Sequence, residues 1–401
     1  MTVKPISTCA CMDNRRKEQI IFLVLILIFT VELIVAFPVT LSAASTMVFR
    51  TKPALAVRVV SYNVLSSHLA DPSFYTTLNP DHLCASNRLP KVFKKLDEEI
   101  SSSDNCVICL QEVSYDWAGA FHTYFANKGY HMVTGLYGRK FNGYMGVALA
   151  YPVGTFETVN VDISNLSDNR IGGWPKSPKA SLTTLAFNNI KSLWAMPLKL
   201  MGLLSEPKED HWTFSGRRSN VLLTAVLKDK KAGQSFCIGN YHMPCAYYMP
   251  MAMTIHAEMA AKHVQDIAAT NQCPYVLAGD WNIKPLSETY QMMTSGQLLA
   301  EDPTFPTPKY GMEWACTMAS MRSAYKEFNG KEPDFTNFSR AKEQEPFIDT
   351  LDYIFLSKEW KVSGVRNICK LEEADGPFPN ADEPSDHVLI RADLELTNGS
   401  S

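Results

Sequence analysis

The sequence predicts an α/β protein in which two β-sheets pack face to face and helices cover their outer sides. Apolar runs of strand length alternate with segments of helical spacing along the chain. The sequence contains no internal repeat. The composition is that of an ordinary globular protein, with 46% hydrophobic and 20% charged residues over 401 positions. A doubly wound α/β fold remains an alternative, because periodicity alone does not separate the two architectures.

The first predicted element is an apolar helix near the N-terminus. Residues 20–37 are almost unbroken apolar and follow three basic residues at 15–17. The run is long enough to span a bilayer, and its positive flank predicts that residues 1–19 are a cytosolic tail. The rest of the chain would then be lumenal or extracellular. The alternative is a leader cleaved at the small residues 40–45, which would give a secreted or organelle-targeted protein.

A small, polar linker is predicted over residues 38–54, and one domain over residues 55–397. The strands of this domain are predicted from short apolar runs, and its helices from apolar residues at helical spacing. The helix over 88–100 places Val92, Phe93, Leu96 and Ile100 on one face, and the helix over 250–269 does the same with Ile255, Met259, Val264 and Ile267. The predicted strands are 56–64, 105–113, 145–152, 220–229, 234–242, 275–280, 350–357 and 387–396, and Ser287 is the predicted N-cap of a further helix.

Residues 164–219 carry few strand signals. They include the apolar stretch SLWAMPLKLMGLL at 192–204. This region is either a helical insert or a loop that leans on a membrane, and the sequence leaves both open.

Charge and cysteine content exclude some classes of protein. The net charge of −3 provides no overall basic field for nucleic acid, so a polyanion would need a local basic patch or a bound metal. The ten cysteines show no zinc-binding spacing. Cys106 and Cys109 lie in an apolar strand and are expected to be packed thiols. The sequons at Asn165, Asn337 and Asn398 matter only in a secretory compartment.

Polar side chains recur at the ends of the predicted strands. A single one is most often a turn former, but a set gathered at one rim would form a preorganised site. The set contains carboxylates, carboxamides and imidazoles and no activated Ser or Cys, which argues against acyl transfer. Oxygen ligands favour Mg²⁺, and phosphoryl transfer needs charge stabilisation and an aligned water. The members are Asn63, Glu112, His242, Asp280, Asn282, Asp352, Asp386 and His387.

Six motifs in a fixed order resemble those of the endonuclease/exonuclease/phosphatase superfamily. They are SYNVL, LQEV, NYHMP, GDWNIKPLSETY, LDYIF and PSDH, and the match that they mark extends over most of residues 55–395. The resemblance implies a four-layer α/β sandwich, with two mixed sheets flanked by helices. It also implies hydrolysis of phosphate esters with Mg²⁺ as the cofactor and Mn²⁺ as the alternative.

The resemblance also implies roles for individual residues. Glu112 corresponds to the principal metal ligand, with Asn63 and Asp386 beside it. Asp280 and Asn282 correspond to the pair that aligns the attacking water and holds the phosphate. Because residues that alternate along a strand point to the same side, both side chains are expected to project together from the end of the strand 275–280.

Two histidines complete the implied site. His387 is expected to contact the phosphate, with Asp352 fixing its tautomer and favouring the imidazolium. His242 corresponds to the second histidine on the phosphate side, which stabilises charge or protonates the leaving oxygen. The identity of the general base stays open.

Finer motifs resemble the deadenylase-like branch, which contains carbon-catabolite-repressor-type poly(A) nucleases, nocturnin, Angel proteins and 2′-phosphodiesterase. These motifs are RSNVLL at 218–223, MRSAY at 321–325 and EPDFTNF at 332–338. They imply substrate contacts from Asn220, Asn337 and Phe335. Phe335 could stack on a base or could equally be a buried strand aromatic.

The favoured function is that of a Mg²⁺-dependent phosphoesterase, either an RNA 3′-exonuclease or a nucleotide phosphatase. Its partners would be an RNA or nucleotide substrate and a membrane, through residues 20–37. One alternative is a membrane-tethered lipid phosphodiesterase of the sphingomyelinase type, suggested by 20–37 and 192–204. Another is an inactive binding module, which the six intact motif centres disfavour.

Overall fold

The computed structural model describes residues 54–178 and 209–397, which belong to the compact unit Lys52–Ser401. The predicted N-terminal helix over 20–37, almost all of the linker and the apolar stretch 192–204 lie outside the described residues. Within the part that is described, no helix is both long enough and apolar enough to cross a bilayer.

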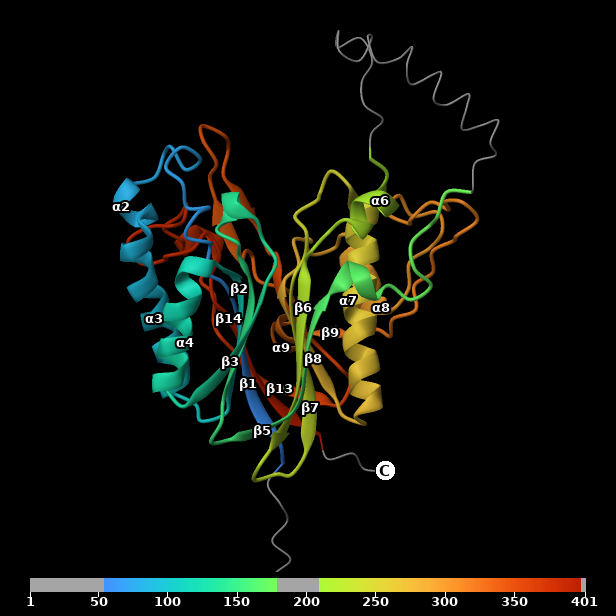
Figure 1. Ribbon diagram of the computed structural model, residues 1–401. Helices are drawn as coiled ribbons and strands as arrows, with labels where there is room; N and C mark the ends of the chain where they lie inside the picture. The colour runs from blue at the N-terminus through green and yellow to red at the C-terminus, as the bar shows by residue number, and fades with distance from the viewer. Residues whose placement is uncertain (1–53, 179–208, 398–401) are drawn as a thin grey trace, which may run out of the picture. The chain divides into compact units, whose positions relative to one another are not determined.

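The described chain forms two six-stranded sheets packed face to face, as Figure 1 shows. The first has the strand order β13-β14-β1-β2-β4-β3 and the second the order β5-β6-β7-β8-β12-β9. The strands of the first sheet are β1 (Ala56–Asn63), β2 (Cys106–Val113), β3 (Tyr130–Leu136), β4 (Gly146–Pro152), β13 (Trp360–Val365) and β14 (Ile390–Leu396). Those of the second are β5 (Phe156–Asn165), β6 (Val221–Asp229), β7 (Ser235–His242), β8 (Tyr275–Asp280), β9 (Arg322–Ser323) and β12 (Asp352–Leu356). A small hairpin pairs β10 (Asn337–Ser339) with β11 (Phe347–Asp349).

Helices cover the outer face of each sheet (Figure 1). The first sheet is covered by α3 (Ala85–Ser101) and α4 (Tyr115–Asn127), and the second by α7 (Pro250–Thr270) and α8 (Glu288–Ser295). The shorter helices are α2 (Pro80–Leu83), α6 (His211–Gly216), α9 (Ala324–Asn329), η1 (Lys140–Asn142), η2 (Leu166–Asn169) and η3 (Leu371–Glu373).

Three apolar layers hold these elements together. Between the sheets, Val59 and Leu149 of the first belong to one buried cluster with Leu223 and Ile238 of the second. Separate clusters join α3 and α4 to the first sheet, and α7 and α8 to the second. Each fully buried aliphatic side chain contributes roughly 1.5–3 kcal/mol of transfer free energy. The architecture is therefore the four-layer α/β sandwich that the sequence predicts, and both sheets are mixed.

Several predicted details are confirmed. Cys106 and Cys109 are fully buried in β2. Ser287 caps α8 by accepting a hydrogen bond from the Tyr290 backbone N–H. The last strand begins at Ile390 rather than at residue 387, and the residues before it form a loop at the rim.

Other elements were not predicted because their sequence signal is weak or was not counted. The edge strand β5 pairs with β6, and half of its residues are exposed. Its Val159, Val161 and Ile163 alternate with polar residues, which is a usable strand signal. In α4, Trp117, Phe121 and Phe125 recur every four residues and bury one face, which is a usable helical signal.

The strand registers bring the polar strand ends to one rim. β1 and β2 run parallel, with Asn63 beside Gln111, and β7 and β8 run parallel, with His242 beside Asp280. β12 runs antiparallel to β8, so that its first residue, Asp352, lies opposite Asp280. The ends of strands from both sheets therefore supply the side chains described next.

Candidate active site

The glycine before Asp280 is required by a close approach between two strands. Gly279 has φ 149°, and a Cβ at this position would lie 1.8 Å from the backbone oxygen of Tyr241 on β7. Only glycine lets β8 pair with β7 at this point. The chain can then present Asp280 at the very end of the strand.

Asp280 and Asn282 were expected to alternate along one strand, but the structure shows a different arrangement. β8 ends at Asp280, and Asn282 has φ 50°, in the left-handed region. The Asn282 backbone N–H donates to Oδ1 of Asp280 at 3.0 Å, and its Nδ2 donates to the Met243 oxygen at 3.0 Å. The two side chains are held by an Asx-type turn, because Asp and Asn bond readily to backbone two residues away.

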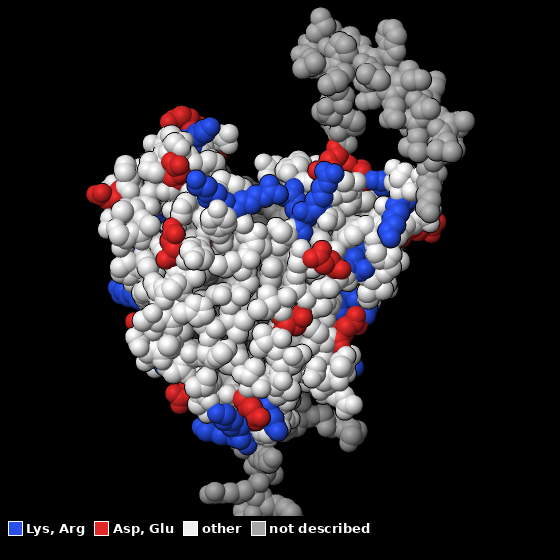
Figure 2. All heavy atoms as spheres, viewed as in Figure 1, with Lys and Arg blue, Asp and Glu red and all other residues white. Residues whose placement is uncertain are grey.

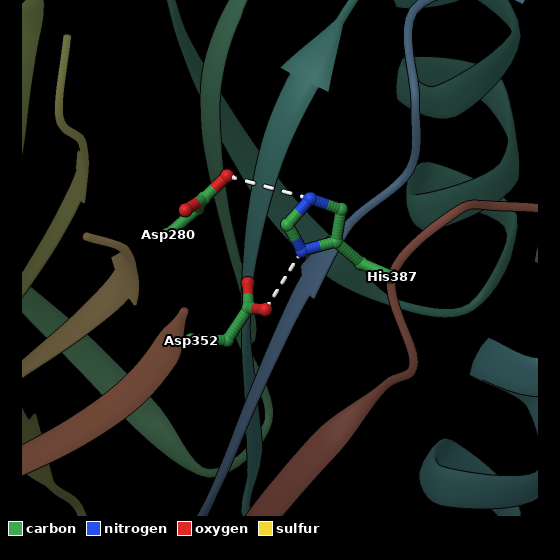
Figure 3. Close-up of side chains that lie close together, drawn as sticks. All are labelled: Asp280, Asp352 and His387. Carbon is green, nitrogen blue, oxygen red and sulfur yellow. Dashed lines mark hydrogen bonds and ion pairs between the residues drawn. The ribbon is translucent and has the colours of Figure 1, made fainter. Parts of the chain in front are cut away.

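His387 is held between two carboxylates, as Figure 3 shows. Its Nδ1 lies 2.7 Å from Oδ2 of Asp352, and its Nε2 lies 3.7 Å from Oδ2 of Asp280. All three side chains are buried. Burial by itself would lower the pKa of His387, but the charges of Asp352 and Asp280 raise it well above its usual value. The imidazole is therefore held as a cation.

Thr336 positions Asp352 and was not identified as a site residue from the sequence. Its hydroxyl donates to Oδ2 of Asp352 at 2.6 Å and accepts hydrogen bonds from the backbone N–H groups of Leu351 and Asp352 at 2.9 and 3.0 Å. The Thr-Asn pair within EPDFTNF was the available signal, but only its asparagine was interpreted.

His242 approaches Asp280 from the neighbouring strand. Its Nε2 lies 3.5 Å from Oδ2 of Asp280, and its Nδ1 lies 3.0 Å from the hydroxyl of Tyr137. Nδ2 of Asn220 donates to the His242 backbone oxygen at 2.8 Å. Burial, with the charges of Glu112 and Asp280, raises the pKa of Tyr137 far above 10, so its hydroxyl stays protonated. Tyr137 follows an edge strand with no distinguishing pattern, and sequence reasoning missed it.

Glu112 lies at an irregular point of β2. It has φ 58°, and the pairing of β2 with β4 shifts register between Leu110 and Val113. Such bulges re-aim side chains next to active sites. Its Oε2 accepts from the Ser66 backbone N–H at 2.9 Å, and its Oε1 lies 3.2 Å from Nδ2 of Asn63.

Asn63 joins the Glu112 side of the site to the Asp280 side, and the loop that carries Asp386 is bonded to Asn63. Nδ2 of Asn63 also donates to Oδ2 of Asp280 at 2.9 Å, which links the two sheets. Oδ2 of Asp386 accepts from the Tyr75 hydroxyl at 3.1 Å, and the neighbouring Ser385 hydroxyl donates to the Asn63 backbone oxygen at 2.7 Å.

A buried arginine holds the loops that carry Asn63 and Asp386. Arg88 of α3 is fully buried, and its guanidinium donates to the backbone oxygens of Pro384, Val64 and Leu65 at 2.5 to 2.6 Å. Charge-assisted bonds of this kind are about twice as strong as neutral ones. No local pattern indicates this role, because a lone arginine in a helix most often faces solvent.

The site has a concentration of negative charge. Among the described residues, no Lys or Arg forms an ion pair with Glu112, Asp280, Asp352 or Asp386. A divalent cation would balance this charge. Asp280, Asp352 and His387 also lie close enough together to bind a metal ion. However, Nδ1 of His387 is already engaged by Asp352 at 2.7 Å, so this group is better described as a hydrogen-bonded histidine.

Two of the residues predicted to bind substrate, Asn337 and Phe335, are buried in the structure. The backbone of Asn337 pairs with that of His387 beside the site, but its side chain is only 3% exposed and accepts a hydrogen bond from Ser339. Phe335 is fully buried against Phe338 and Phe378. Its ring is not available to stack on a base, which corrects that prediction and matches the alternative of a buried aromatic.

Comparison with known proteins identifies the family to which this site belongs. Residues 60–387 match the endonuclease/exonuclease/phosphatase family. The chain is 24% identical to carbon catabolite repressor protein 4 homolog 2 of Arabidopsis thaliana, over 87% of this chain and 59% of that protein. It is also 24% identical to the CCR4-Not complex 3′-5′-exoribonuclease subunit Ccr4 of Kluyveromyces lactis, over 86% of this chain and 41% of that one. The chain therefore spans about two-fifths to three-fifths of the length of these relatives.

A solved structure shares the fold. The crystal structure of ANGEL2, a 2′,3′-cyclic phosphatase, in complex with adenosine-2′,3′-vanadate superposes with a TM-score of 0.63 at 20% identity, covering 86% of this chain and 96% of that one. The family match over residues 60–387 shows that the chain belongs to the endonuclease/exonuclease/phosphatase family.

Proposed function

We propose that this protein hydrolyses a phosphate ester at the 3′ end of RNA or in a nucleotide, with Mg²⁺ as cofactor and Mn²⁺ as a possible substitute. The observation that carries the proposal is the position of Asp280. Its Oδ2 lies 2.9 Å from Nδ2 of Asn63, 3.5 Å from Nε2 of His242 and 3.7 Å from Nε2 of His387. A carboxylate placed beside a carboxamide donor and two imidazoles can orient a water molecule against a bound phosphate.

Glu112, Asn63 and Asp386 would hold the metal ion. All three offer oxygen atoms, the ligands that Mg²⁺ prefers, and neither carboxylate forms an ion pair with a described Lys or Arg. A bound divalent ion supplies positive charge to the phosphate oxygens and makes a coordinated water more acidic.

The remaining residues act on the substrate directly. In this proposal Asp280 orients the attacking water, and Asn282 holds a phosphate oxygen with its carboxamide. The imidazolium of His387 faces the phosphate and stabilises the charge that develops in the transition state. His242 donates a hydrogen bond to the leaving oxygen. Asn337 and Asn220 are proposed to act through the backbones of His387 and His242, which they contact.

The substrate class is proposed from the similar proteins. One relative is named as a 3′-5′-exoribonuclease subunit, and the similar structure is titled as a 2′,3′-cyclic phosphatase. The first name describes cleavage of RNA from its 3′ end, and the second describes removal of a 2′,3′-cyclic phosphate. The lipid phosphodiesterase alternative rests on sequence stretches outside the described residues.

A substrate panel tests the proposal. The full chain, purified in detergent with Mg²⁺, would be assayed on oligoadenylate, single-stranded DNA, RNA ending in a 2′,3′-cyclic phosphate, NADPH and sphingomyelin. We expect turnover of an RNA or nucleotide substrate that chelation abolishes. Turnover of sphingomyelin alone would replace the proposal by the lipid alternative.

The location of the domain is a separate proposal that rests on sequence. Residues 20–37 and their basic flank suggest a single membrane pass with the domain on the lumenal or extracellular side. Protease protection in microsomes tests it, since a domain digested without detergent would lie on the cytosolic side.

A further inference from the structure

An open pocket of about 500 Å³ lies next to the catalytic rim and plays no part in the proposed chemistry. Its lining residues are Tyr115, Leu136, Tyr137, Gly138 and Tyr144. Tyr115 is 66% exposed and Tyr144 is 50% exposed. The pocket thus offers two solvent-facing aromatic rings around an apolar hollow.

The backbone of Tyr144 indicates that the pocket is a built feature. Tyr144 has φ 50°, a left-handed conformation that favours glycine and is costly for a bulky residue. Its backbone N–H donates to the Arg139 oxygen at 2.9 Å, which holds this conformation. Strain of this kind tends to be kept where it serves a binding site.

Hydrogen bonds fix the pocket rigidly to both sides of the catalytic site. Tyr115 starts α4 three residues after Glu112, and the hydroxyl of Tyr137 lies 3.0 Å from Nδ1 of His242. Ser66 bonds to Glu112 through its backbone N–H and to the Asn142 oxygen through its hydroxyl, each at 2.9 Å. A group bound in the pocket would therefore lie beside a phosphate held between Glu112 and His242.

The edge of the pocket is cationic. Arg139 and Lys140 are exposed at η1, which lies between Tyr137 and Tyr144 in the chain, and neither forms an ion pair with another described residue. Figure 2 shows Lys and Arg side chains along the hollowed upper edge of the molecule, over η1 and the start of β6. An occupant that complements this pocket is flat and aromatic and carries a negative charge beside its ring.

We propose that this pocket is a nucleobase subsite, in which Tyr115 and Tyr144 stack on the base next to the scissile phosphate. The inference rests on the proposed function and names the part of the substrate that the pocket takes. Stacking on aromatic side chains tolerates any base, because every base has a π face. A membrane surface is less suited to this site, because the rings enclose a hollow joined to His242 rather than forming a protruding patch.

Kinetics on two substrates test the subsite. Tyr115→Ala and Tyr144→Ala should each raise KM for an oligoadenylate roughly tenfold, with hydrolysis of bis(p-nitrophenyl) phosphate unchanged. Tyr144→Trp should keep the wild-type KM, since it preserves an aromatic face. Phe328→Ala is the matched control, because Phe328 is also 50% exposed but lies on α9, outside the pocket. An unchanged KM in both alanine variants would overturn the inference.

A binding measurement separates this inference from the proposed function. Adenosine 5′-monophosphate should bind the wild-type protein more tightly than ribose 5-phosphate does, and Tyr144→Ala should remove the difference. This result needs no turnover, so it can hold even if RNA is not the substrate. Equal binding of the two ligands would overturn the subsite. So would loss of binding to vesicles of phosphatidylcholine and phosphatidylserine in the alanine variants with an unchanged KM, which would indicate a membrane contact.

Discussion

His387 and Asp352 form a buried pair in which Nδ1 of the imidazole lies 2.7 Å from Oδ2 of the carboxylate. The pair comes from the start of β12 and from the loop before β14, which belong to different sheets. The imidazole of His387 becomes cationic because the packing of the two sheets brings it against Asp352. The pair leaves Nε2 as the nitrogen that faces Asp280 and the site of the phosphate.

Removing the negative charge of this pair should reduce catalysis. Asp352→Asn keeps the size of the side chain but no longer favours the imidazolium. We expect kcat to fall by about a hundredfold or more, with KM changed much less. Steady-state kinetics would measure both. Asp349→Asn on β11 is the matched control, since Asp349 pairs with Lys284 instead. Wild-type turnover in Asp352→Asn would show that His387 needs no buried carboxylate.

Glu112 should decide metal binding more than folding. Its carboxylate is half-buried at an irregular backbone position. Glu112→Ala should abolish activity, weaken binding of Mg²⁺ or Mn²⁺ by calorimetry at least tenfold, and remove the rise in Tm that the metal gives the wild-type protein. Glu157→Ala, at an exposed position of β5, should behave like wild type. Unchanged metal affinity in Glu112→Ala would remove it from the ligand set.

Arg88 should be important for stability. Its three charge-assisted hydrogen bonds join α3 to the backbones near Asn63 and Asp386. Arg88→Ala leaves three buried carbonyls unpaired, so the free energy of unfolding should fall by roughly 3 to 5 kcal/mol. Urea denaturation would measure this, with Lys94→Ala on the exposed side of α3 as the control. A loss below about 1 kcal/mol would mean that the loops are held by other contacts.

A buried histidine away from the site should make stability depend on pH. His256 of α7 lies 2.8 Å from the hydroxyl of Tyr241 and 3.2 Å from the Ser215 oxygen, and burial lowers its pKa to about 4. Unfolding restores a pKa of about 6.5, so the unfolded chain binds the proton first as the pH falls. The contribution of neutral, buried His256 to the free energy of unfolding is complete above about pH 6.5 and is lost as the pH falls towards 4.

The expected loss between pH 8 and pH 5 is about 2 kcal/mol of unfolding free energy. Urea denaturation at the two pH values measures it in wild type and in His256→Gln, where this part of the pH dependence should disappear. His263→Gln, on the same helix but paired with Asp162 near the surface, is the control. If the free energy of unfolding of His256→Gln depended on pH as that of the wild type does, other groups would be responsible for the effect.

The strand ends show what could be predicted from sequence alone. The runs before Asn63, Glu112, His242 and Asp280 are apolar and short, and polar residues end them, so the strands and the candidate residues are local features. The order of the motifs added the four-layer fold and the family. These predictions succeed because buried strands need apolar residues and because this chemistry needs carboxylates, carboxamides and imidazoles.

The residues that support the site could not be found in this way. Tyr137, Thr336, Tyr75 and Arg88 act through partners that are 105, 16, 311 and up to 296 positions away in the chain. Nothing in their local sequence sets them apart from an edge-strand tyrosine, a loop threonine or a surface arginine. Phe335 shows the reverse case, since a motif suggested a base contact and packing buried the ring.

The sequence by itself determined the secondary structure of the core, the fold and the chemical class of the site, because each depends on local pattern and on residue type. Tertiary structure alone decided which nitrogen of His387 faces the site, how Asp280 and Asn282 are turned, and where an aromatic pocket opens beside His242. These properties depend on strand register and on contacts between the two sheets, which exist only once the chain has folded.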